Sequence, residues 1–192
     1  MSQYGFYFDM SRCVGCRACQ LACKGKNGLT LEATLRRVRT FETGTYPNPG
    51  IYHLAETCNH CENALCVDIC PTSALVKLDN GIVDHNPELC IGCRVCIPAC
   101  PYDAPQYVEE QDTIKKCDFC RDLVENRGSP ACVDACMMRA LHFGEMSDLA
   151  ATYGADAVKD LPVLPPSSTA NPSLLIKPRR HAFSTSFVEK QV

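Results

Sequence analysis

The chain has 192 residues, a net charge of −3 and ordinary shares of hydrophobic (46%) and charged (21%) residues, as in one globular domain or two small ones. Its basic residues cluster no further than pairs such as Arg36-Arg37, Lys115-Lys116 and Arg179-Arg180, so charge does not support nucleic-acid binding. No apolar run approaches the ~18 residues of a membrane span, and the N-terminal residues lack the pattern of a signal peptide. The unusual feature is cysteine, with 16 residues, at the level where a cysteine-based scaffold must be considered.

These cysteines lie in four groups of four along the chain. The first and third groups have the spacing C-x2-C-x2-C-x3-C, whereas the middle gap is four residues in the second group and eleven in the fourth. The groups are Cys13, Cys16, Cys19 and Cys23; Cys58, Cys61, Cys66 and Cys70; Cys90, Cys93, Cys96 and Cys100; and Cys117, Cys120, Cys132 and Cys136.

The segments between the groups carry local structural signals. Residues 24–57 show weak strand signals around a turn with the sequence Thr-Tyr-Pro-Asn-Pro-Gly. Between the second and third groups, Asn80-Gly81 separates two apolar-rich runs, and this pattern predicts a β-hairpin within residues 74–83.

The segment after the fourth group begins with a predicted helix. Residues 147–153 have the pattern of a short helix, with Ser147 as the candidate N-cap and Gly154 as the stop. The proline-rich segment beyond it cannot build a core of its own, so it is either a flexible end or an extended arm over a partner chain. We favour the arm, because the apolar run 174–176 would otherwise be exposed in an unstructured tail.

The groups repeat in pairs. Residues 13–19 read CVGCRAC and residues 90–96 read CIGCRVC, so the first group resembles the third. Residues 66–75 read CVDICPTSAL and residues 132–141 read CVDACMMRAL, so the second group resembles the fourth. The chain therefore looks like a duplicated unit, each copy of which carries two groups.

Three kinds of bond would explain grouped cysteines. Disulfides are disfavoured, because cysteines three residues apart in a tight turn rarely meet the required Cα separation and Cβ directions. Zinc is disfavoured, because structural zinc sites usually take two C-x2-C pairs, whereas here a third cysteine follows at the same short interval. The run C-x2-C-x2-C-x3-C-P is the ligand run of bacterial ferredoxins, so we expect iron–sulfur clusters.

The ferredoxin rule assigns ligands across groups, because the fourth cysteine of each run ligates the other cluster. We number four sets of ligands by the cluster that each would hold. For the middle groups the rule predicts a third set, Cys58, Cys61, Cys66 and Cys100, and a fourth set, Cys70, Cys90, Cys93 and Cys96. The repeat extends it to a first set, Cys13, Cys16, Cys19 and Cys136, and a second set, Cys23, Cys117, Cys120 and Cys132. This nested pairing is inferred from the repeat, and the spacing alone does not prove it.

The expected fold class is α+β, with two bacterial-ferredoxin-like modules, one inserted in the other and related by a pseudo-two-fold axis. Residues 1–56 and 101–146 would form the outer module, and residues 57–100 the inserted one. Residues 147–192 would form a C-terminal helix and an extended arm on the partner subunit. Because clusters would replace much of the hydrophobic core, we expect the protein without iron to be largely unfolded.

The sequence resembles the four-cluster electron-transfer (beta) subunits of the dimethyl sulfoxide reductase family of molybdopterin oxidoreductases. It is similar in length and in sequence motifs to the beta subunits of dimethyl sulfoxide, polysulfide, tetrathionate and thiosulfate reductases. The resemblance is strong over residues 4–145 and rests on the segments YGFYFDMSRCVGCRACQLACK, CNHCENALCVDICPTSAL, CIGCRVCIPACPYDAPQY and KKCDFC. It implies the nested ligand pairing and places the first set nearest the catalytic subunit, with the fourth set toward the far end.

The resemblance also implies the cofactors and partners. Some relatives have tryptophan at the position of Cys93 and bind a 3Fe-4S cluster there, so cysteine at this position implies four 4Fe-4S clusters. The implied function is to relay single electrons to or from a large catalytic subunit with a molybdenum or tungsten bis-pterin centre, often with a quinol-oxidising membrane anchor subunit. We expect a complex at the cell membrane, exported together with a partner that has a twin-arginine signal, or alternatively a cytoplasmic complex.

Two alternative functions stay open at this point: a free-standing polyferredoxin, and a beta subunit of a soluble molybdenum hydroxytransferase or dehydroxylase. We find no catalytic arrangement in the chain, and we expect none of its five histidines to be a ligand. Arg17 and Arg94 occupy equivalent loop positions, where each is either a solvated residue or a cation that raises a cluster potential. Met137 and Met138 are expected to pack beside a cluster as apolar filler.

Overall fold

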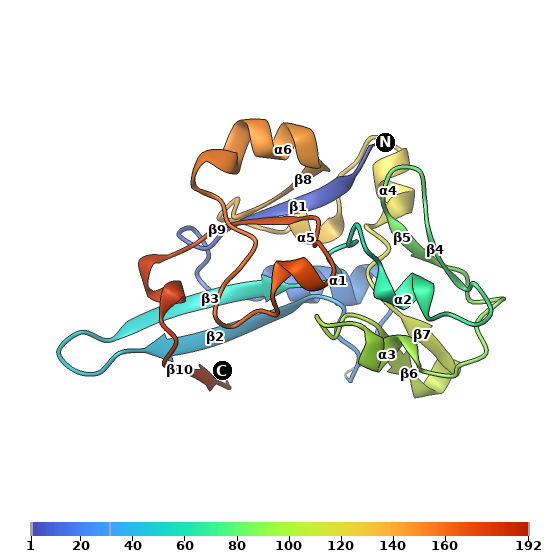
Figure 1. The fold of residues 1–192 in the computed structure, drawn as a ribbon, viewed down its shortest axis with the longest axis horizontal. Coiled ribbons are helices and arrows are strands. Elements are labelled where there is room, and N and C mark those ends of the chain that lie inside the picture. The colour runs from blue at the N-terminus through green and yellow to red at the C-terminus, as the bar shows by residue number, and fades with distance from the viewer. Residues whose placement is uncertain (1, 31, 192) are drawn as a thin grey trace.

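The computed structural model describes residues 2–30 and 32–191, and its mixture of strands and short helices confirms the α+β class (Figure 1). The strands are β1 (Tyr4–Asp9), β2 (Arg37–Thr43), β3 (Gly50–Glu56), β4 (Leu75–Lys77), β5 (Val83–His85), β6 (Gln106–Val108), β7 (Thr113–Lys115), β8 (Leu141–Glu145), β9 (Leu174–Lys177) and β10 (Phe187–Lys190). The α-helices are α1 (Ala18–Lys26), α2 (Leu65–Asp68), α3 (Cys96–Ala99), α4 (Arg121–Glu125), α5 (Ala131–Asp134) and α6 (Met146–Tyr153). None of the helices in the described ranges combines the length and the hydropathy that crossing a membrane requires.

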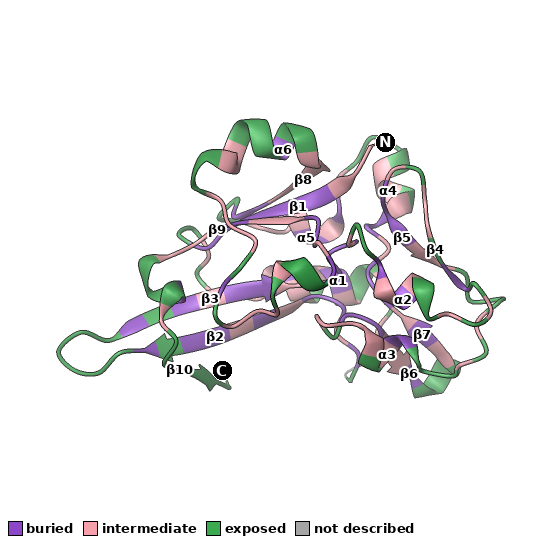
Figure 2. Cartoon of the chain, in the orientation of Figure 1, coloured by how far each residue is buried: buried purple, intermediate pink, exposed green. Residues whose placement is uncertain are grey.

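One sheet has the order β8-β1-β9, with β8 antiparallel and β9 parallel to the central strand β1. Phe6 and Phe8 of β1 enter the main core, where each is 1% exposed. On β1, Tyr7 stacks on Tyr153 of α6 with 4.2 Å between ring centroids, so α6 lies against this sheet (Figure 1). Both faces of β1 are therefore buried, as the purple strand in Figure 2 shows.

A second sheet has the order β10-β2-β3 and confirms the strand signals in residues 24–57. β2 and β3 form a long antiparallel hairpin whose turn contains the predicted Thr-Tyr-Pro-Asn-Pro-Gly segment (Figure 1). Phe41 and Tyr52 stack across the hairpin with 5.1 Å between centroids, and both are fully buried. This sheet therefore covers the same core as β1.

The remaining strands form the hairpins β4-β5 and β6-β7. The hairpin β4-β5 confirms the Asn80-Gly81 prediction, although its loop runs over residues 78–82 and is longer than a two-residue turn. Gly81 has φ = 80°, a left-handed conformation that glycine adopts without strain. The hairpin lies beside α2, at the right of Figure 1.

A smaller hydrophobic core joins these hairpins to α2 and α3. Leu75, Val83 and Ile114 are almost fully buried in it, and Tyr107 packs against it. Because Tyr107 and Ile114 lie on β6 and β7, this core extends past residue 100, where we expected the inserted module to end. The division of the chain into two modules stays a prediction.

The C-terminal segment departs from the expectation of an arm. Residues 174–177 form β9 in the chain's own sheet, and Ile176 is fully buried there. The reason for expecting an arm does not hold for these residues, because β1 offers a strand edge within the chain that pairs with them. An arm of the later residues over a partner stays a prediction.

The helix predicted at residues 147–153 is present as α6, but its start differs. It begins at Met146, after Glu145, and no side chain caps its N-terminus, so Ser147 is not the N-cap. Gly154 follows the helix as predicted, yet its φ of −70° is right-handed, and a 3-10 turn over Gly154–Asp156 continues from it.

Candidate metal centres

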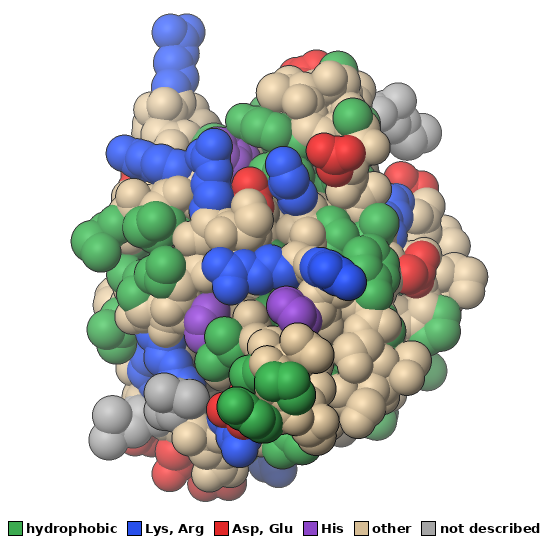
Figure 3. All heavy atoms as spheres, turned by 90° about the vertical axis from the view of Figure 1, so that its left-hand side faces the viewer, with side chains coloured by type: hydrophobic (Ala, Val, Ile, Leu, Met, Phe, Trp, Pro, Cys, Tyr) green, Lys and Arg blue, Asp and Glu red, His purple; other side chains and the backbone are tan. Residues whose placement is uncertain are grey.

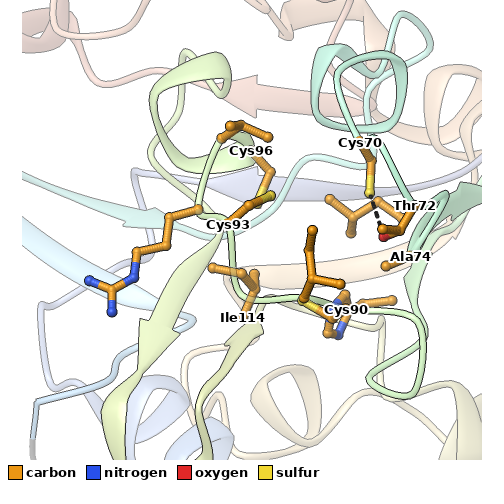
Figure 4. Close-up of a pocket in the computed structure, with 12 residues that line it drawn as sticks. Cys70, Thr72, Ala74, Cys90, Cys93, Cys96 and Ile114 are labelled. Carbon is orange, nitrogen blue, oxygen red and sulfur yellow. Dashed lines mark hydrogen bonds between the residues drawn. The ribbon is translucent and has the colours of Figure 1, made fainter.

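All sixteen cysteines are free thiols, and they gather from distant parts of the chain. One cavity is lined by the cysteines of the fourth set (Figure 4). Cys70 comes from the end of α2, Cys90 and Cys93 from the loop after β5, and Cys96 from the start of α3. Their side chains point toward one another across the cavity in Figure 4.

Two further cavities have the same character. One is lined by the third set, Cys58, Cys61, Cys66 and Cys100. The other is lined by the first set, Cys13, Cys16, Cys19 and Cys136. In each case the cysteines of one sequence group are joined by one cysteine from another group. Met138 lines the last cavity, as predicted for an apolar filler, but it is also 43% exposed, and Met137 is 76% exposed.

The second set lies in the interior, where α1 packs against α5. Its four cysteines, Cys23, Cys117, Cys120 and Cys132, are all buried. Burial raises the pKa of the Cys23 thiol to about 12, with Cys132 and Cys120 among the neighbouring thiols that add to the shift. The same helix pairing recurs in the smaller core, where α2 packs against α3.

The four sets follow one another through a shared helix and shared cores. Cys19 of the first set and Cys23 of the second set lie one turn apart on α1. Cys117 of the second set and Cys58 of the third set belong to the main core, and Cys66 of the third set and Cys96 of the fourth set belong to the smaller core. The first set is thus next to the second, the second next to the third, and the third next to the fourth.

Exposure differs between the ends and the middle of this series. Cys16 in the first set and Cys93 in the fourth set are exposed, whereas the other cysteines are buried or half-buried. Exposed apolar side chains lie beside each end: Val14 lines the first cavity, and Ile91 lines the fourth. The series therefore reaches the surface at both ends and is enclosed between them.

The backbone of the cysteine loops repeats as the sequence does. Gly15 and Gly92 have φ of 69° and 64°, and Arg17 and Arg94 have φ of 61° and 62°. A left-handed conformation at a residue other than glycine is unfavourable by about 1–2 kcal/mol. The two loops therefore share the same wrapped, partly strained form around their cysteines.

Backbone and side-chain donors reach the sulfur atoms. The Ala140 N–H donates to Cys136 Sγ at 3.2 Å, and the Phe119 N–H donates to Cys117 Sγ at 3.4 Å. At Cys70, burial raises the thiol pKa, but hydrogen bonds from the Leu75 and Thr72 N–H groups outweigh it, and the pKa is lowered overall. Donors of this kind stabilise a thiolate, which is the form that binds metal.

At several other thiols burial outweighs any such donor, and the pKa is raised overall. Burial and neighbouring thiols together raise the pKa of Cys61 and Cys66 to about 12. Burial raises the pKa of Cys19 and Cys96 to about 11. Gathering such thiols without a bound group is unfavourable for the thiolate form, so these sets fit a group that supplies positive charge from metal ions.

Polar atoms beside the sets also lack protein partners. Among the residues that the structure describes, no hydrogen bond satisfies Tyr102 Oη at the third-set cavity or His85 Nε2 at the fourth-set cavity. Within the same described ranges, no three His, Cys, Asp or Glu side chains converge as ligands of one metal ion. The thiols ring a space instead, and both the sulfur ligands and the free polar groups fit an iron–sulfur cluster, whose sulfur atoms accept hydrogen bonds.

Several basic residues stand near the sets. Arg17 and Arg94 line the first and fourth cavities, and Arg94 lies over the Tyr107 ring with Cζ 3.4 Å from the centroid. Sequence reasoning missed Arg36 and Lys116, which are 2% and 5% exposed. The only signal was their occurrence in basic pairs, which does not tell which member of a pair is buried.

The histidines also take defined positions. His60 lies inside the second group and is fully buried, with Nδ1 accepting a hydrogen bond from the Val83 N–H at 3.0 Å. This bond assigns the proton of the neutral ring to Nε2. Burial lowers the pKa of His60 well below its usual value, so the ring is neutral.

Comparison with known proteins adds the family. The chain matches the family described as "4Fe-4S dicluster domain" over residues 50–146 and that described as "4Fe-4S binding domain" over residues 10–28. It is 42% identical to the B subunit of anaerobic dimethyl sulfoxide reductase from Haemophilus influenzae over 191 residues, which cover 95% of this chain and 92% of that protein. The B subunit of the same name in Escherichia coli is 40% identical over 192 residues, which cover 96% and 93%.

A further relative is Protein NrfC of Escherichia coli, which is 42% identical over 149 residues, or 76% of this chain and 67% of that protein. The matched ranges contain the cysteine groups that form the cavities. Four-iron ferredoxin motifs and thiol-ringed cavities thus point to the same cofactor. As its sequence predicted, this protein belongs to the family of iron–sulfur (beta) subunits of the dimethyl sulfoxide reductase family.

Proposed function

We propose that this chain relays single electrons through four 4Fe-4S clusters, to or from a catalytic subunit with a molybdenum or tungsten bis-pterin centre. The four sets defined above are the proposed ligands, so each cluster takes cysteines from two groups. A bound 4Fe-4S cluster supplies a centre that accepts or donates one electron. The chain itself would be a non-catalytic subunit.

The observation that carries this proposal is the serial arrangement of the sets. Both end sets have one exposed cysteine, Cys16 or Cys93, whereas the second set is fully buried. A store of isolated metal sites would need no such order. A relay needs it, because electrons must enter and leave at the surface and pass through an interior that excludes solvent.

The first set is the proposed contact point for the catalytic subunit, by analogy with the family. His53 packs against the loop of the first set, since a Cβ atom added at Gly15 would lie only 2.6 Å from the His53 ring. Burial lowers the pKa of His53, and the charges of Arg179 and Arg17 lower it further, so basic side chains lie beside this set. Lys and Arg side chains gather among hydrophobic ones on the face in Figure 3. A basic and partly apolar face of this kind suits a protein interface with polar and apolar parts.

The fourth set would lie at the opposite end of the relay, toward a membrane anchor subunit that oxidises quinol. We propose a complex at the cell membrane, exported with a catalytic partner that carries a twin-arginine signal. A twin-arginine signal in the gene of the catalytic chain would support this location, and its absence would support a cytoplasmic complex.

The fold in this proposal is a pair of ferredoxin-like modules related by a pseudo-two-fold axis. The pairing of α1 with α5 and of α2 with α3 supports it, since each pair joins the two cysteine groups of one module. Equivalent loop conformations at Arg17 and Arg94 support it as well.

The alternatives differ in partner. A free-standing polyferredoxin would elute from size-exclusion chromatography of native extract as a monomer near 21.1 kDa. The proposed subunit would elute with a much larger catalytic chain. A soluble molybdenum hydroxytransferase or dehydroxylase would share that elution, and the sequence of the co-purifying polypeptide would identify it.

The ligand assignment is tested by anaerobic purification with analysis of iron, acid-labile sulfide and EPR spectra. We expect four reducible 4Fe-4S clusters in the native protein. A 3Fe-4S signal in the oxidised native protein would contradict the role of Cys93 in the fourth set.

A further inference from the structure

Two basic side chains are buried among the cysteine sets. Arg36 is 2% exposed and Lys116 is 5% exposed, although charged residues are rarely buried without a partner of opposite charge. Within residues 2–30 and 32–191, neither side chain forms an ion pair with Asp or Glu. Their burial therefore needs another source of negative charge.

Arg36 lies between the first and second sets. Its Nη1 donates to the Ala55 carbonyl at 3.2 Å, and Ala55 lines the cavity of the first set. Its Cζ lies 4.8 Å from the centroid of the Phe6 ring. The Phe6 ring in turn stacks on Phe119, with 4.4 Å between the ring centroids. Phe119 stands in the sequence between two cysteines of the second set, Cys117 and Cys120. The guanidinium thus contacts the wall of the first set directly, and Phe6 and Phe119 separate it from the second set.

The Arg36 donors are only partly used. Among the described residues, Nε and Nη2 have no hydrogen-bond partner. A guanidinium is not deprotonated in proteins. The group therefore stays a cation, with unpaired donors close to sulfur ligands.

Lys116 lies between the second and third sets. It lines the third-set cavity, and it directly precedes Cys117 of the second set. Its Nζ donates to the carbonyl of Cys117 at 2.6 Å and to the carbonyl of Val83. These carbonyls hold the ammonium in place without neutralising it.

We propose that Arg36 and Lys116 are positioning residues that raise the reduction potentials of the clusters on either side of them: Arg36 for the first and second sets, and Lys116 for the second and third. The inference rests on the proposed function, because it requires the four clusters. Reduction adds one electron, and hence one negative charge, to a buried cluster. A fixed cation stabilises that charge, and it does so more strongly inside the protein than at an exposed position.

The Arg36 guanidinium exchanges no proton in this step, and two carbonyls hold Lys116 Nζ in place. The electron comes from the partner subunit in the proposed relay, or from a mediator in a titration. The fourth set has no buried basic residue of this kind among the side chains that line its cavity. The two cations therefore act on the first three sets and not on the fourth.

The test is an EPR-monitored redox titration of the native complex. Arg36→Met should lower two of the four midpoint potentials, each by at least a tenfold change in the reduction equilibrium, or about 59 mV for one electron. Lys116→Met should lower two as well, one of them shared with Arg36. Arg36→Lys and Lys116→Arg should retain most of the potential, because they keep the charge.

The matched controls are Arg37→Met and Lys115→Met, which change the neighbouring member of each basic pair. Arg37 is partly exposed and pairs with Asp103 at 2.8 Å, so its change should leave the four potentials in place. Unchanged potentials in fully loaded Arg36→Met and Lys116→Met would overturn the inference. If Arg36→Met fails to load clusters, Arg36→Gln takes its place, because it removes the charge while keeping a polar side chain. Unchanged potentials in Arg36→Gln would then overturn the inference.

The titration of the wild-type protein tests the proposed function separately from the role of the two cations. Fewer than four reducible clusters in the wild-type protein contradict the proposed function. Four clusters with potentials that do not respond to either methionine variant contradict only the role of the two cations.

Discussion

Cys93 is the residue that decides the type of one cluster. It is exposed, so its side chain contributes little to the packing of the smaller core. Cys93→Ala should therefore leave the fold intact and convert the centre of the fourth set to a 3Fe-4S cluster. The measurement is EPR of the oxidised protein, with Cys16→Ala as the matched change at the other end. A spectrum without a 3Fe-4S signal in the loaded variant would refute this role.

Arg94 differs from Arg36 in exposure. It is exposed and stacks on Tyr107, so solvent screens its charge. Arg94→Ala should lower the potential of the fourth-set cluster by less than Arg36→Met lowers its clusters, as measured by potentiometry. Arg17→Ala is the equivalent change at the first set. If no potential moves downward in either variant, these two arginines are ordinary loop residues.

Residue identity alone predicted the cysteine groups but not the buried cations. The cysteine spacing is local, and the ligand chemistry follows from it. Arg36 and Arg37 look alike in the sequence, yet one is enclosed by Phe6 and Ala55, and the other lies at the surface. That difference depends on where distant strands pack, which no local pattern encodes.

Among the elements, β9 shows the limit of local reasoning most clearly. Its apolar residues were recognised, but its parallel pairing with β1 joins segments near opposite ends of the chain. The hairpin β4-β5 could be predicted, because Asn80-Gly81 and the flanking runs are contiguous. Local turns are readable in this chain, whereas long-range strand pairing is not.

β9 also gives a stability prediction. Ile176 is fully buried between β1 and the core, so Ile176→Ala should destabilise the loaded protein by about 2–5 kcal/mol. The shift in the urea unfolding midpoint measures this effect. Val188→Ala, at an exposed position of β10, is the control and should change stability by less than about 0.5 kcal/mol. Equal midpoints for the two variants would mean that β9 does not stabilise the isolated chain.

At the scale of the whole molecule, the clusters are expected to be part of the core. Cys19, Cys58, Cys117 and Cys132 belong to the main hydrophobic core, and Cys66 and Cys96 belong to the smaller one. Chelation of iron under reducing, anaerobic conditions should therefore unfold the chain, with loss of far-UV circular dichroism. Reconstitution with iron and sulfide should restore it. Retention of a native spectrum after complete removal of iron would show that the polypeptide packs without clusters.

The serial order of the four sets is the central claim for the molecule, and reductive titration tests it most directly. The anaerobic native complex is titrated with a one-electron reductant while EPR and visible spectra are recorded. We expect uptake of one electron for each of four clusters, with magnetic coupling between neighbouring clusters once both are reduced. Uptake by fewer clusters, or four signals without any coupling between neighbours, would contradict a continuous relay from Cys16 at one surface to Cys93 at the other.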